Sequence, residues 1–453
     1  MRGRIDSIGR GSSFSAFSRI PTGAEGVAST LVWICVCGWA ASARAQQEPP
    51  GAAVAPLGAF TRAERALLAP HFERGAVILV EFSDDVALPG IVMGLPVRAA
   101  AADLAALLAE PTGYPRFMPA LDTVQPTDRR GSLLAYRWTW RTALFTLRGN
   151  ALVTRWPPPG TRADRPHRVD VRATGGDLGT GRLVWRVYPW GPERSLLVLS
   201  ARLDVRGANW ITRQIQDGIR SVNRSFNIAL GLTMLLSTRR EAEQRAGMRG
   251  LHAVVEEPLP EPRRPDVDVV ALAPTLARGD LILLELHGER LAQASVIGRC
   301  WNEPGAVRAV MHDPRAFAPA LIAGSWAHVL AERDEVLDVA WGVRMPLLGT
   351  EGRLRVQRAP GLVEMHAVEG ALRGGYWRFE QGLLPWGEAH LVGWTRFDPR
   401  TANWLLRMLV DGTPDFGLGI VAGAQVMVLR ALRTRAWEWH EERARARTSP
   451  PTP

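Results

Sequence analysis

The chain has 453 residues, of which 46% are hydrophobic and 22% are charged, and these values exclude wholesale disorder. Its length predicts two domains, each large enough to bury a core of its own. The formal net charge of +10 suggests an anionic partner, but every basic residue is arginine and the arginines are spread along the chain. We therefore expect no nucleic acid among the partners of this protein.

A targeting segment is predicted at the N-terminus. Several arginines precede the apolar run Val27–Ala41, which is shorter than the roughly 20 residues that cross a bilayer as a helix. The pattern Ala43-Arg44-Ala45 follows, as at signal-peptide cleavage sites. We expect residues 1–45 to be a signal peptide cleaved after Ala45, so that the mature protein is exported, either periplasmic or membrane-associated. An uncleaved membrane anchor and a misassigned start codon are the alternatives.

The sequence contains no motif that indicates catalysis or metal binding. Cys300 is the only cysteine beyond the predicted signal peptide, so the mature chain cannot form an intrachain disulfide, and we expect it to be a buried core residue. The histidines form neither HExxH nor a zinc-ligand spacing, and no GxSxG is present. GGDLGTG at Gly175 lacks the GK[ST] end of a phosphate loop. We predict no metal, no cofactor and no catalytic residue.

The first part of the mature chain predicts a linker, a strand, a helix and a tight corner. Residues 46–68 are interpreted as an Ala/Pro-rich linker that ends in a short helix. AVILVEF from Ala76 has strand character, and Arg98–Ala109 is rich in the strong helix formers Ala and Leu. Two prolines in Tyr114–Leu121 forbid a regular helix interior and predict a packed corner.

An antiparallel meander is predicted between residues 122 and 204, because turn signals separate a series of short apolar runs. The first of these runs is LLAYRWTWR, in which Leu134, Tyr136, Trp138 and Trp140 alternate and so share one strand face.

The meander leads into one long helix. Asn209–Leu236 predicts an amphipathic helix, because its apolar residues recur in steps of three and four and Asn209 can cap its start. From about Ile228 the pattern is apolar on most sides, so this end should be covered by protein or lipid. Residues 238–272 follow as a linker that starts basic and helical and becomes proline-rich and charged.

The second half of the chain repeats the first. RGAVILVEF at Arg74 returns as RGDLILLEL at Arg278, an offset of 278 − 74 = 204. MPAL returns as APAL with an offset of 200, PWG returns with an offset of 196, and ANW at Ala208 returns at Ala402 with an offset of 194. Four collinear matches with so small a drift indicate an internal duplication.

The second long helix, Asn403–Leu429, differs from the first. It contains Pro414, which should kink or restart the helix near Thr413, whereas the first copy has Gly218 and Ile219 at this place and should run straighter. A bend that gates a cavity and a static kink both fit this pattern.

The order of elements resembles the START-like superfamily, also called SRPBCC, which includes polyketide cyclases and lipid-transport proteins. The resemblance covers roughly residues 86–237 and 289–437. It depends on Leu95-Pro96-Val97, on the corner Tyr114–Pro119 with its counterpart Asp313–Pro319, and on the helices from Asn209 and Asn403.

This resemblance implies an α+β fold of two tandem helix-grip (START/Bet v 1-like) domains. Each would be a curved antiparallel sheet around a long C-terminal helix, with the first at residues 69–237 and the second at residues 273–437. A disordered tail, residues 438–453, would end the chain.

The resemblance also implies a cavity between sheet and helix, which family members use for lipids, sterols, quinones or polyketides. Aromatic side chains are candidates for its walls, although they also suit ordinary core packing. The candidates are Tyr136, Trp138, Trp140, Trp185 and Phe226 in the first half and Trp341, Trp377, Phe379 and Trp394 in the second.

The function that we expect is non-enzymatic binding and transport of a lipid or other apolar small molecule, with an anionic membrane surface as a further partner. The first alternative is a cyclase/aromatase-like enzyme that acts on a hydrophobic substrate in the same cavity. The second is a scaffold whose cavities are filled by its own side chains.

Overall fold

The computed structural model describes residues 57–82, 90–141, 146–156, 166–177, 179, 181–203, 220–248, 257–322, 324–344 and 349–448. The predicted signal peptide, residues 1–45, lies outside the described residues, as does the expected helix start from Asn209 to Ile219.

The first half follows the predicted order of elements. It opens with the short helices α2 (Arg62–Leu67) and α3 (Ala69–Phe72). The strands β1 (Gly75–Glu81) and β2 (Ile91–Val97), the helix α4 (Ala101–Ala109) and the 3-10 helix η1 (Pro111–Arg116) follow. The meander then consists of β3 (Leu121–Arg130), β4 (Leu133–Arg141), β5 (Thr146–Trp156), β6 (His167–Gly176), β7 (Arg182–Gly191) and β8 (Arg194–Arg202). The long helix α6 (Arg220–Arg245) closes the half.

The second half repeats this order. It begins with α7 (Ala273–Arg278), β9 (Gly279–His287), β10 (Arg290–Cys300), α8 (Pro304–Met311) and α9 (Pro314–Leu321). The meander consists of β11 (Ser325–Arg333), β12 (Val336–Val343), β13 (Thr350–Ala359), β14 (Leu362–Gly370), β15 (Tyr376–Leu383) and β16 (Ala389–Arg396). The 3-10 helix η2 (Pro399–Thr401) and the helices α10 (Trp404–Gly412) and α11 (Pro414–Thr448) end it.

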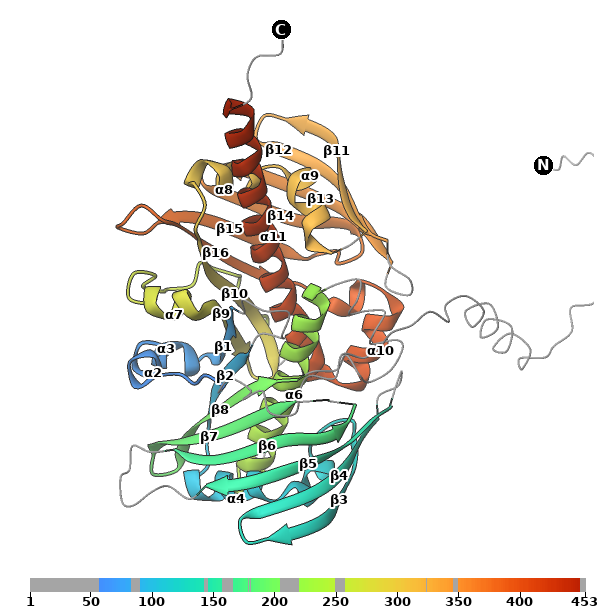
Figure 1. Ribbon diagram of the computed structural model, residues 1–453. Helices are drawn as coiled ribbons and strands as arrows, with labels where there is room; N and C mark the ends of the chain where they lie inside the picture. Colours follow the sequence, from blue (N-terminus) through green and yellow to red (C-terminus); the bar gives the residue numbers. More distant parts are fainter. Residues whose placement is uncertain are drawn as a thin grey trace, which may run out of the picture. The chain divides into compact units, whose positions relative to one another are not determined.

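Sixteen strands of the described residues form one antiparallel sheet, in the order β11-β12-β13-β14-β15-β16-β10-β9-β1-β2-β8-β7-β6-β5-β4-β3 (Figure 1). The expected helix-grip unit is present in each half. It consists of one strand, a helical pair, six meander strands and a long helix. Each half also has one additional strand, β1 or β9, and these two strands pair with each other. The fold is therefore a tandem helix-grip α+β fold, in which both units share one sheet.

Helices cover both faces of this sheet. On the face that we call the inner face, α6 packs on β2 and β8, and α11 packs on β10 and β16 (Figure 1). A large apolar cluster, the inner cluster, lies there and includes Ile78, Met93, Trp185, Phe379 and Leu429. On the opposite outer face, α3 and α7 cover a smaller outer cluster that includes Phe72, Leu79, Leu276, Leu283 and Trp394.

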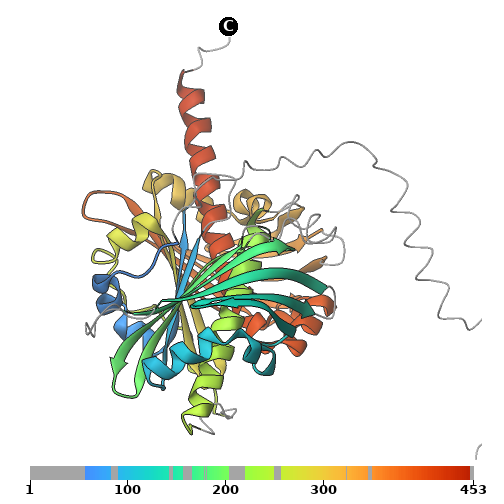
Figure 2. The ribbon, with the colours of Figure 1, turned by 60° about the horizontal axis from the view of Figure 1, so that its bottom comes forward.

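The two long helices lie side by side in antiparallel orientation (Figure 2). A Cβ atom added to Gly419 would collide with the Cα of Ala229, and one added to Gly423 would lie 2.5 Å from the Oγ of Ser225. Because glycine has no side chain, α11 can approach α6 this closely.

The break in the second long helix is confirmed. α10 ends at Gly412, Thr413 has φ −150° and ψ 87°, and α11 begins at Pro414. Proline lacks an N–H and fits the first turn of a helix, so the chain restarts there. Asn403 caps α10, since its side chain accepts a hydrogen bond of 2.9 Å from the Leu406 N–H.

Three expected boundaries differ. Residues 121–130 form β3, which the sequence pattern did not predict because this edge strand is mostly exposed and contains Pro126. α6 continues past Leu236 to Arg245. α11 continues to Thr448, so residues 438–448 of the expected disordered tail are helical, supported by pairs such as Arg445–Glu441.

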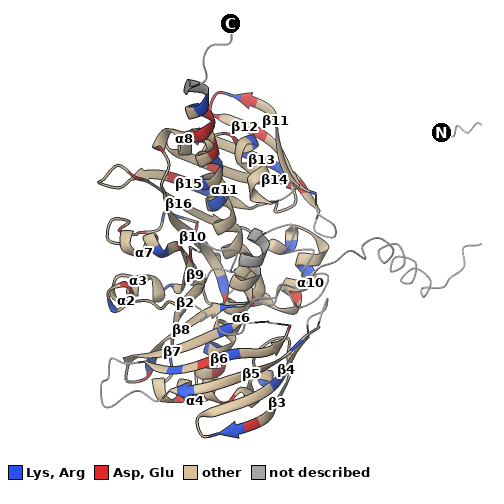
Figure 3. Ribbon diagram, in the orientation of Figure 1, with Lys and Arg blue, Asp and Glu red and all other residues tan. Residues whose placement is uncertain are grey.

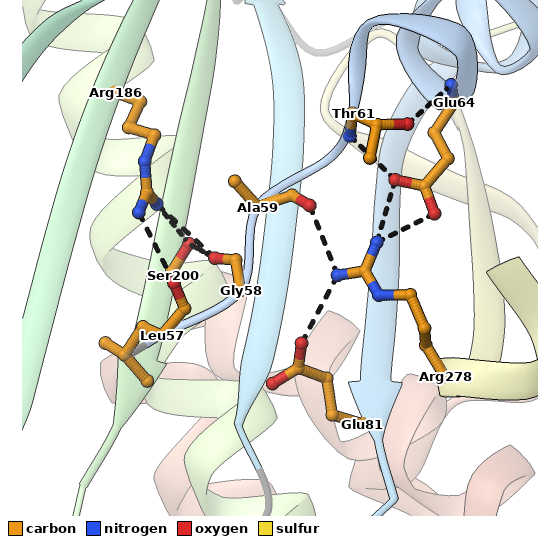
Figure 4. A network of polar contacts seen from close by, with 9 residues as sticks. All are labelled: Leu57, Gly58, Ala59, Thr61, Glu64, Glu81, Arg186, Ser200 and Arg278. Carbon is orange, nitrogen blue, oxygen red and sulfur yellow. Dashed lines mark hydrogen bonds and ion pairs between the residues drawn. The ribbon is translucent and has the colours of Figure 1, made fainter. Parts of the chain in front are cut away.

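The segment before β1 is anchored to both halves (Figure 4). The Arg186 guanidinium on β7 donates a hydrogen bond to the Gly58 carbonyl. The Ser200 hydroxyl on β8 donates a second hydrogen bond to the same carbonyl, at 2.7 Å. Arg278, from the second half, binds both carboxylate oxygens of Glu64 at 2.7 and 2.8 Å and donates to the Ala59 carbonyl at 3.1 Å. The N-terminal segment therefore ties the two halves together.

Candidate functional site

A groove opens at the same place in each half. In the first half it measures about 500 Å³ and is lined by the corner Pro115–Asp122 and by Arg141 at the end of β4. In the second half it measures about 710 Å³ and its lining includes Trp326 and Arg344.

The backbone shows that these positions are equivalent. The Arg141 N–H donates to the Ala120 carbonyl just before β3, and the Arg344 N–H donates to the Gly324 carbonyl just before β11. Both grooves therefore lie at the end of the first meander hairpin. The first-half groove is lined by the helical corner, whereas the second-half groove is lined by the start of β13, by Ala371 and by Thr401 and Ala402. The sequence predicted the packed corner Tyr114–Leu121 that lines the first-half groove, but it gave no signal for Arg141 or Arg344, because isolated arginines are common in this chain.

Most of the aromatic candidates lie on the inner face. Tyr136 and Trp138 on β4, Trp185 on β7, and Trp377 and Phe379 on β15 are buried members of the inner cluster. Trp185 and Phe379 are counterparts by strand register, because Trp185 pairs with Leu199 of β8 as Phe379 pairs with Gly393 of β16, and Leu199 and Gly393 in turn pair with the equivalent strands β2 and β10. Trp140 is partly buried and packs against the same cluster.

The other three candidates have different positions. Trp341 alternates with Leu337 and Val339 along β12, so it faces the inner side and is half-buried. Trp394 belongs to the outer cluster, where the Arg378 guanidinium lies 5.4 Å from its ring centroid. Phe379 pairs with Gly393 across the ladder, and Trp394 is the next residue after Gly393, so the Trp394 and Phe379 side chains point to opposite faces and cannot share a cavity. The side chain of Phe226 lies outside the described residues.

Two buried phenols lie near the corner of the first half. Tyr114 on η1 donates a hydrogen bond of 2.5 Å to the Leu108 carbonyl. Burial raises the pKa of Tyr114 well above its usual value, and the nearby Tyr136 and Glu110 raise it further. Burial also raises the pKa of Tyr136. Both phenols are therefore neutral at physiological pH, and they can serve as hydrogen-bond groups but not as general bases.

A buried ionic cluster fixes α11 to the sheet of the second half. The Asp280 carboxylate is fully buried and accepts hydrogen bonds from Arg433 at 2.6 Å and from Arg430 at 2.8 Å. Burial would raise the pKa of Asp280, but the two guanidinium groups outweigh it and the pKa is lowered. Because each charge is paired, this cluster is structural and offers no free acid or base.

Cys300 is buried next to this cluster and forms no disulfide, as expected. Burial raises its pKa to about 11. The described residues contain no group of three or more His, Cys, Asp or Glu side chains that could hold a metal ion. Figure 3 shows basic and acidic residues interspersed along the strands and helices, in keeping with the even spread of arginines in the sequence.

One helix in the described part of the chain, Pro414–Arg445, is long and apolar enough to cross a membrane. However, 61% of the most apolar 18-residue stretch of this helix is buried within the fold, where α11 packs against α6, α8, α9 and β10. This is the burial of a core helix. The cover that the sequence required for the apolar end of α6 is also present, since Ile228, Leu232 and Leu236 are buried within the fold.

No protein-family model matches the chain, and no curated protein matches it in sequence. Among solved structures, the chain is similar to the di-domain ARO/CYC StfQ from the steffimycin biosynthetic pathway, with 10% identity, 77% of this chain and 99% of that chain covered, and a TM-score of 0.27.

Two single-unit structures are also similar. One is the Zhui aromatase/cyclase from a Streptomyces species, with 20% identity, 36% of this chain and 98% of that chain covered, and a TM-score of 0.28. The other is a fragment of a STAR-related lipid transfer protein from Xanthomonas axonopodis, with 16% identity, 38% and 94% covered, and a TM-score of 0.29. At these identities and TM-scores the likeness transfers no activity.

Proposed function

We propose that this protein binds an apolar small molecule or lipid between the sheet and the long helix, and that it carries this ligand without changing it. The observation that carries the proposal is the coincidence of two features in both halves. Buried aromatic side chains gather on the inner face, and a groove opens at the end of the first meander hairpin. Ligand sites are typically concave, mostly apolar and lined by such side chains.

The rival proposal is a cyclase/aromatase-like enzyme in the same space. Tyr136 is a polar side chain that could orient a substrate by a hydrogen bond in the first half, but its raised pKa makes it a poor proton donor, and the Tyr114 hydroxyl is engaged by the Leu108 carbonyl. The carrier is favoured because the buried carboxylates Asp280, Glu243 and Asp415 are each engaged by arginine side chains.

Mass spectrometry of organic extracts tests the proposal. The mature protein is purified from a membrane-free extract, its bound small molecules are identified, and the recovered compound is incubated with fresh protein. A compound that binds and is returned unchanged supports the carrier, whereas conversion to a product supports the enzyme. If no compound is recovered and none of a panel of lipids binds, the scaffold with filled cavities is the better description.

We further propose that the protein is exported and works at an anionic membrane face. N-terminal sequencing of the protein from its native host should give a chain that starts at Gln46. Flotation with vesicles tests the second point, since contact with anionic lipid should be lost in high salt. Equal binding to neutral and anionic vesicles would contradict it.

A further inference from the structure

Gln425 is a polar residue on the inner face of the second half. It lies on α11, four residues before Leu429, so the two side chains share one side of the helix. A Cβ atom added to Gly298 on β10 would lie 2.5 Å from a δ carbon of Leu429, which shows that this side of α11 faces the sheet. The neighbours Val421 and Ala422 belong to the inner cluster.

The Gln425 amide has no hydrogen-bond partner. The side chain is fully buried, and neither its Nε2 nor its Oε1 is bonded to any described residue. Gln293 is almost as buried and shows the usual arrangement, since its Oε1 accepts from the Arg263 N–H at 2.6 Å and its Nε2 donates to the Arg263 carbonyl at 2.7 Å. A buried amide without partners destabilises a fold and calls for an explanation.

The fold itself does not require an amide at this position. The counterpart of Gln425 in the first half is Gly231, since 425 − 231 = 194. A Cβ atom added to Gly231 would lie 3.1 Å from the sulfur of Met93, so in the first half this space is filled by an apolar side chain of the sheet. The same fold is thus built with an apolar contact in one half and an unpaired amide in the other.

A second unpaired donor lies on the inner face of the second half. The indole Nε1 of Trp341 is buried and has no partner among the described residues. The larger of the two grooves opens on this half, and its lining includes Val343, which lies two residues beyond Trp341 on β12 and so faces the same side.

We infer that the second half is the ligand-binding half, and that its ligand is a neutral apolar molecule with a hydroxyl group that bonds to Gln425. This inference rests on the proposed function. A primary amide both donates and accepts, and a hydroxyl group matches it in both respects. A charged group is disfavoured, because an unpaired charge is far more costly to bury than a hydroxyl.

The test compares 1-decanol with decyl methyl ether by isothermal titration calorimetry on the full mature chain. The ether only accepts hydrogen bonds and has one more carbon, so apolar burial alone would favour it. The wild type should bind the alcohol roughly three- to tenfold more tightly. Gln425→Met should bind the ether at least as well as the alcohol, and it should unfold at a higher temperature because an unpaired amide is removed.

Gln293→Met is the matched control, since it removes a buried amide of the second half that is bonded to Arg263 and that points away from the inner cluster, opposite to its neighbour Ala294. It should keep the preference for the alcohol. If Gln425→Met also keeps that preference, the inference about Gln425 is wrong while the proposed function stands. If the wild type binds neither compound, the proposed function fails together with the inference.

Discussion

Ile78 pairs directly with Ile282 in the ladder between β1 and β9. These residues are counterparts, since 282 − 78 = 204 is the offset that relates Arg74 to Arg278. An antiparallel pair of equivalent strands centred on equivalent residues has a local pseudo-twofold axis. The long helices obey the same relation. Gly419 is the counterpart of Ser225, and Gly423 is the counterpart of Ala229. Gly419 packs against Ala229, and Gly423 packs against Ser225, as a twofold axis requires. The duplicated units are therefore arranged like the two subunits of an isologous dimer.

The pseudo-twofold axis also relates two ion pairs, which provide a matched test. Arg278 binds Glu81 at 3.3 Å, and its counterpart Arg74 lies 3.6 Å from Glu285. Only Arg278 binds Glu64 in addition. Arg278→Ala should lower the free energy of unfolding by about 2–3 kcal/mol and Arg74→Ala by at most about 1 kcal/mol, as measured by urea unfolding. Equal losses would show that the anchoring of the N-terminal segment contributes nothing.

The Glu64 contact should also make stability depend on pH. Burial opposes ionisation of Glu64, but the Thr61 N–H and the Arg278 charge outweigh it, so the pKa lies below the ordinary value of 4.5. A lowered pKa in the folded state stabilises the fold fully above pH 4.5, and this contribution is lost as the pH falls through the folded value. The stability difference between wild type and Glu64→Gln should therefore shrink on acidification from pH 7 to pH 3. A constant difference would count against the assignment.

The close contact of the two long helices predicts a sharp contrast between two glycines. Gly419→Ala would place a methyl group against the Ala229 backbone and should destabilise the protein by about 1–3 kcal/mol, despite the better helix propensity of alanine. Gly412 is also helical, but a Cβ atom added there would have no neighbour within 4 Å, so Gly412→Ala should stabilise by up to about 1 kcal/mol. Thermal unfolding of both variants measures the contrast, and opposite signs are expected.

Local patterns in the sequence predicted much of the fold. The strand alternation at Tyr136 and Trp138, the helix restart at Pro414 and the burial of Cys300 depend on residues near one another in the chain, and all three are confirmed. The duplication was visible because short runs recur in the same order, and the repeated order of elements confirms it. β3 was missed, because an exposed edge strand has no apolar alternation to reveal it.

The long-range arrangement could not be predicted from such patterns. β1 and β9 read as ordinary buried strands, and nothing in either run shows that each pairs with the other. Similarly, the separation of Trp394 from Phe379 depends on the register of β15 and β16, which places them on opposite faces. Gln425 was not singled out, since one polar residue on a long helix is normally solvated rather than buried.

Cys300 gives an inexpensive test of the packing around α11. Its thiol is buried and its pKa is raised to about 11, so almost no thiolate forms below pH 9. A folded chain that starts at Gln46, and so lacks Cys35 and Cys37, should therefore not react with a thiol reagent such as Ellman's reagent at pH 8, whereas the same chain unfolded should react completely. Rapid reaction of the folded protein would mean that α11 separates from β10 on the timescale of the assay.

The buried pair of arginines around Asp280 predicts the largest single loss of stability. Asp280→Asn leaves Arg430 and Arg433 buried without a counter-charge and should lower the free energy of unfolding by about 3–5 kcal/mol. In the first half, Ala76 stands at the position of Asp280, since 280 − 76 = 204. Leu236 stands at the position of Arg430, since 430 − 236 = 194, so the first half has apolar residues at both positions. The triple variant Asp280→Ala/Arg430→Leu/Arg433→Met should thus regain most of the stability that the single variant loses, because well-packed apolar groups often replace a buried ionic cluster at little cost. If the triple variant is as unstable as Asp280→Asn, the cluster does more than fill the space between α11 and the sheet.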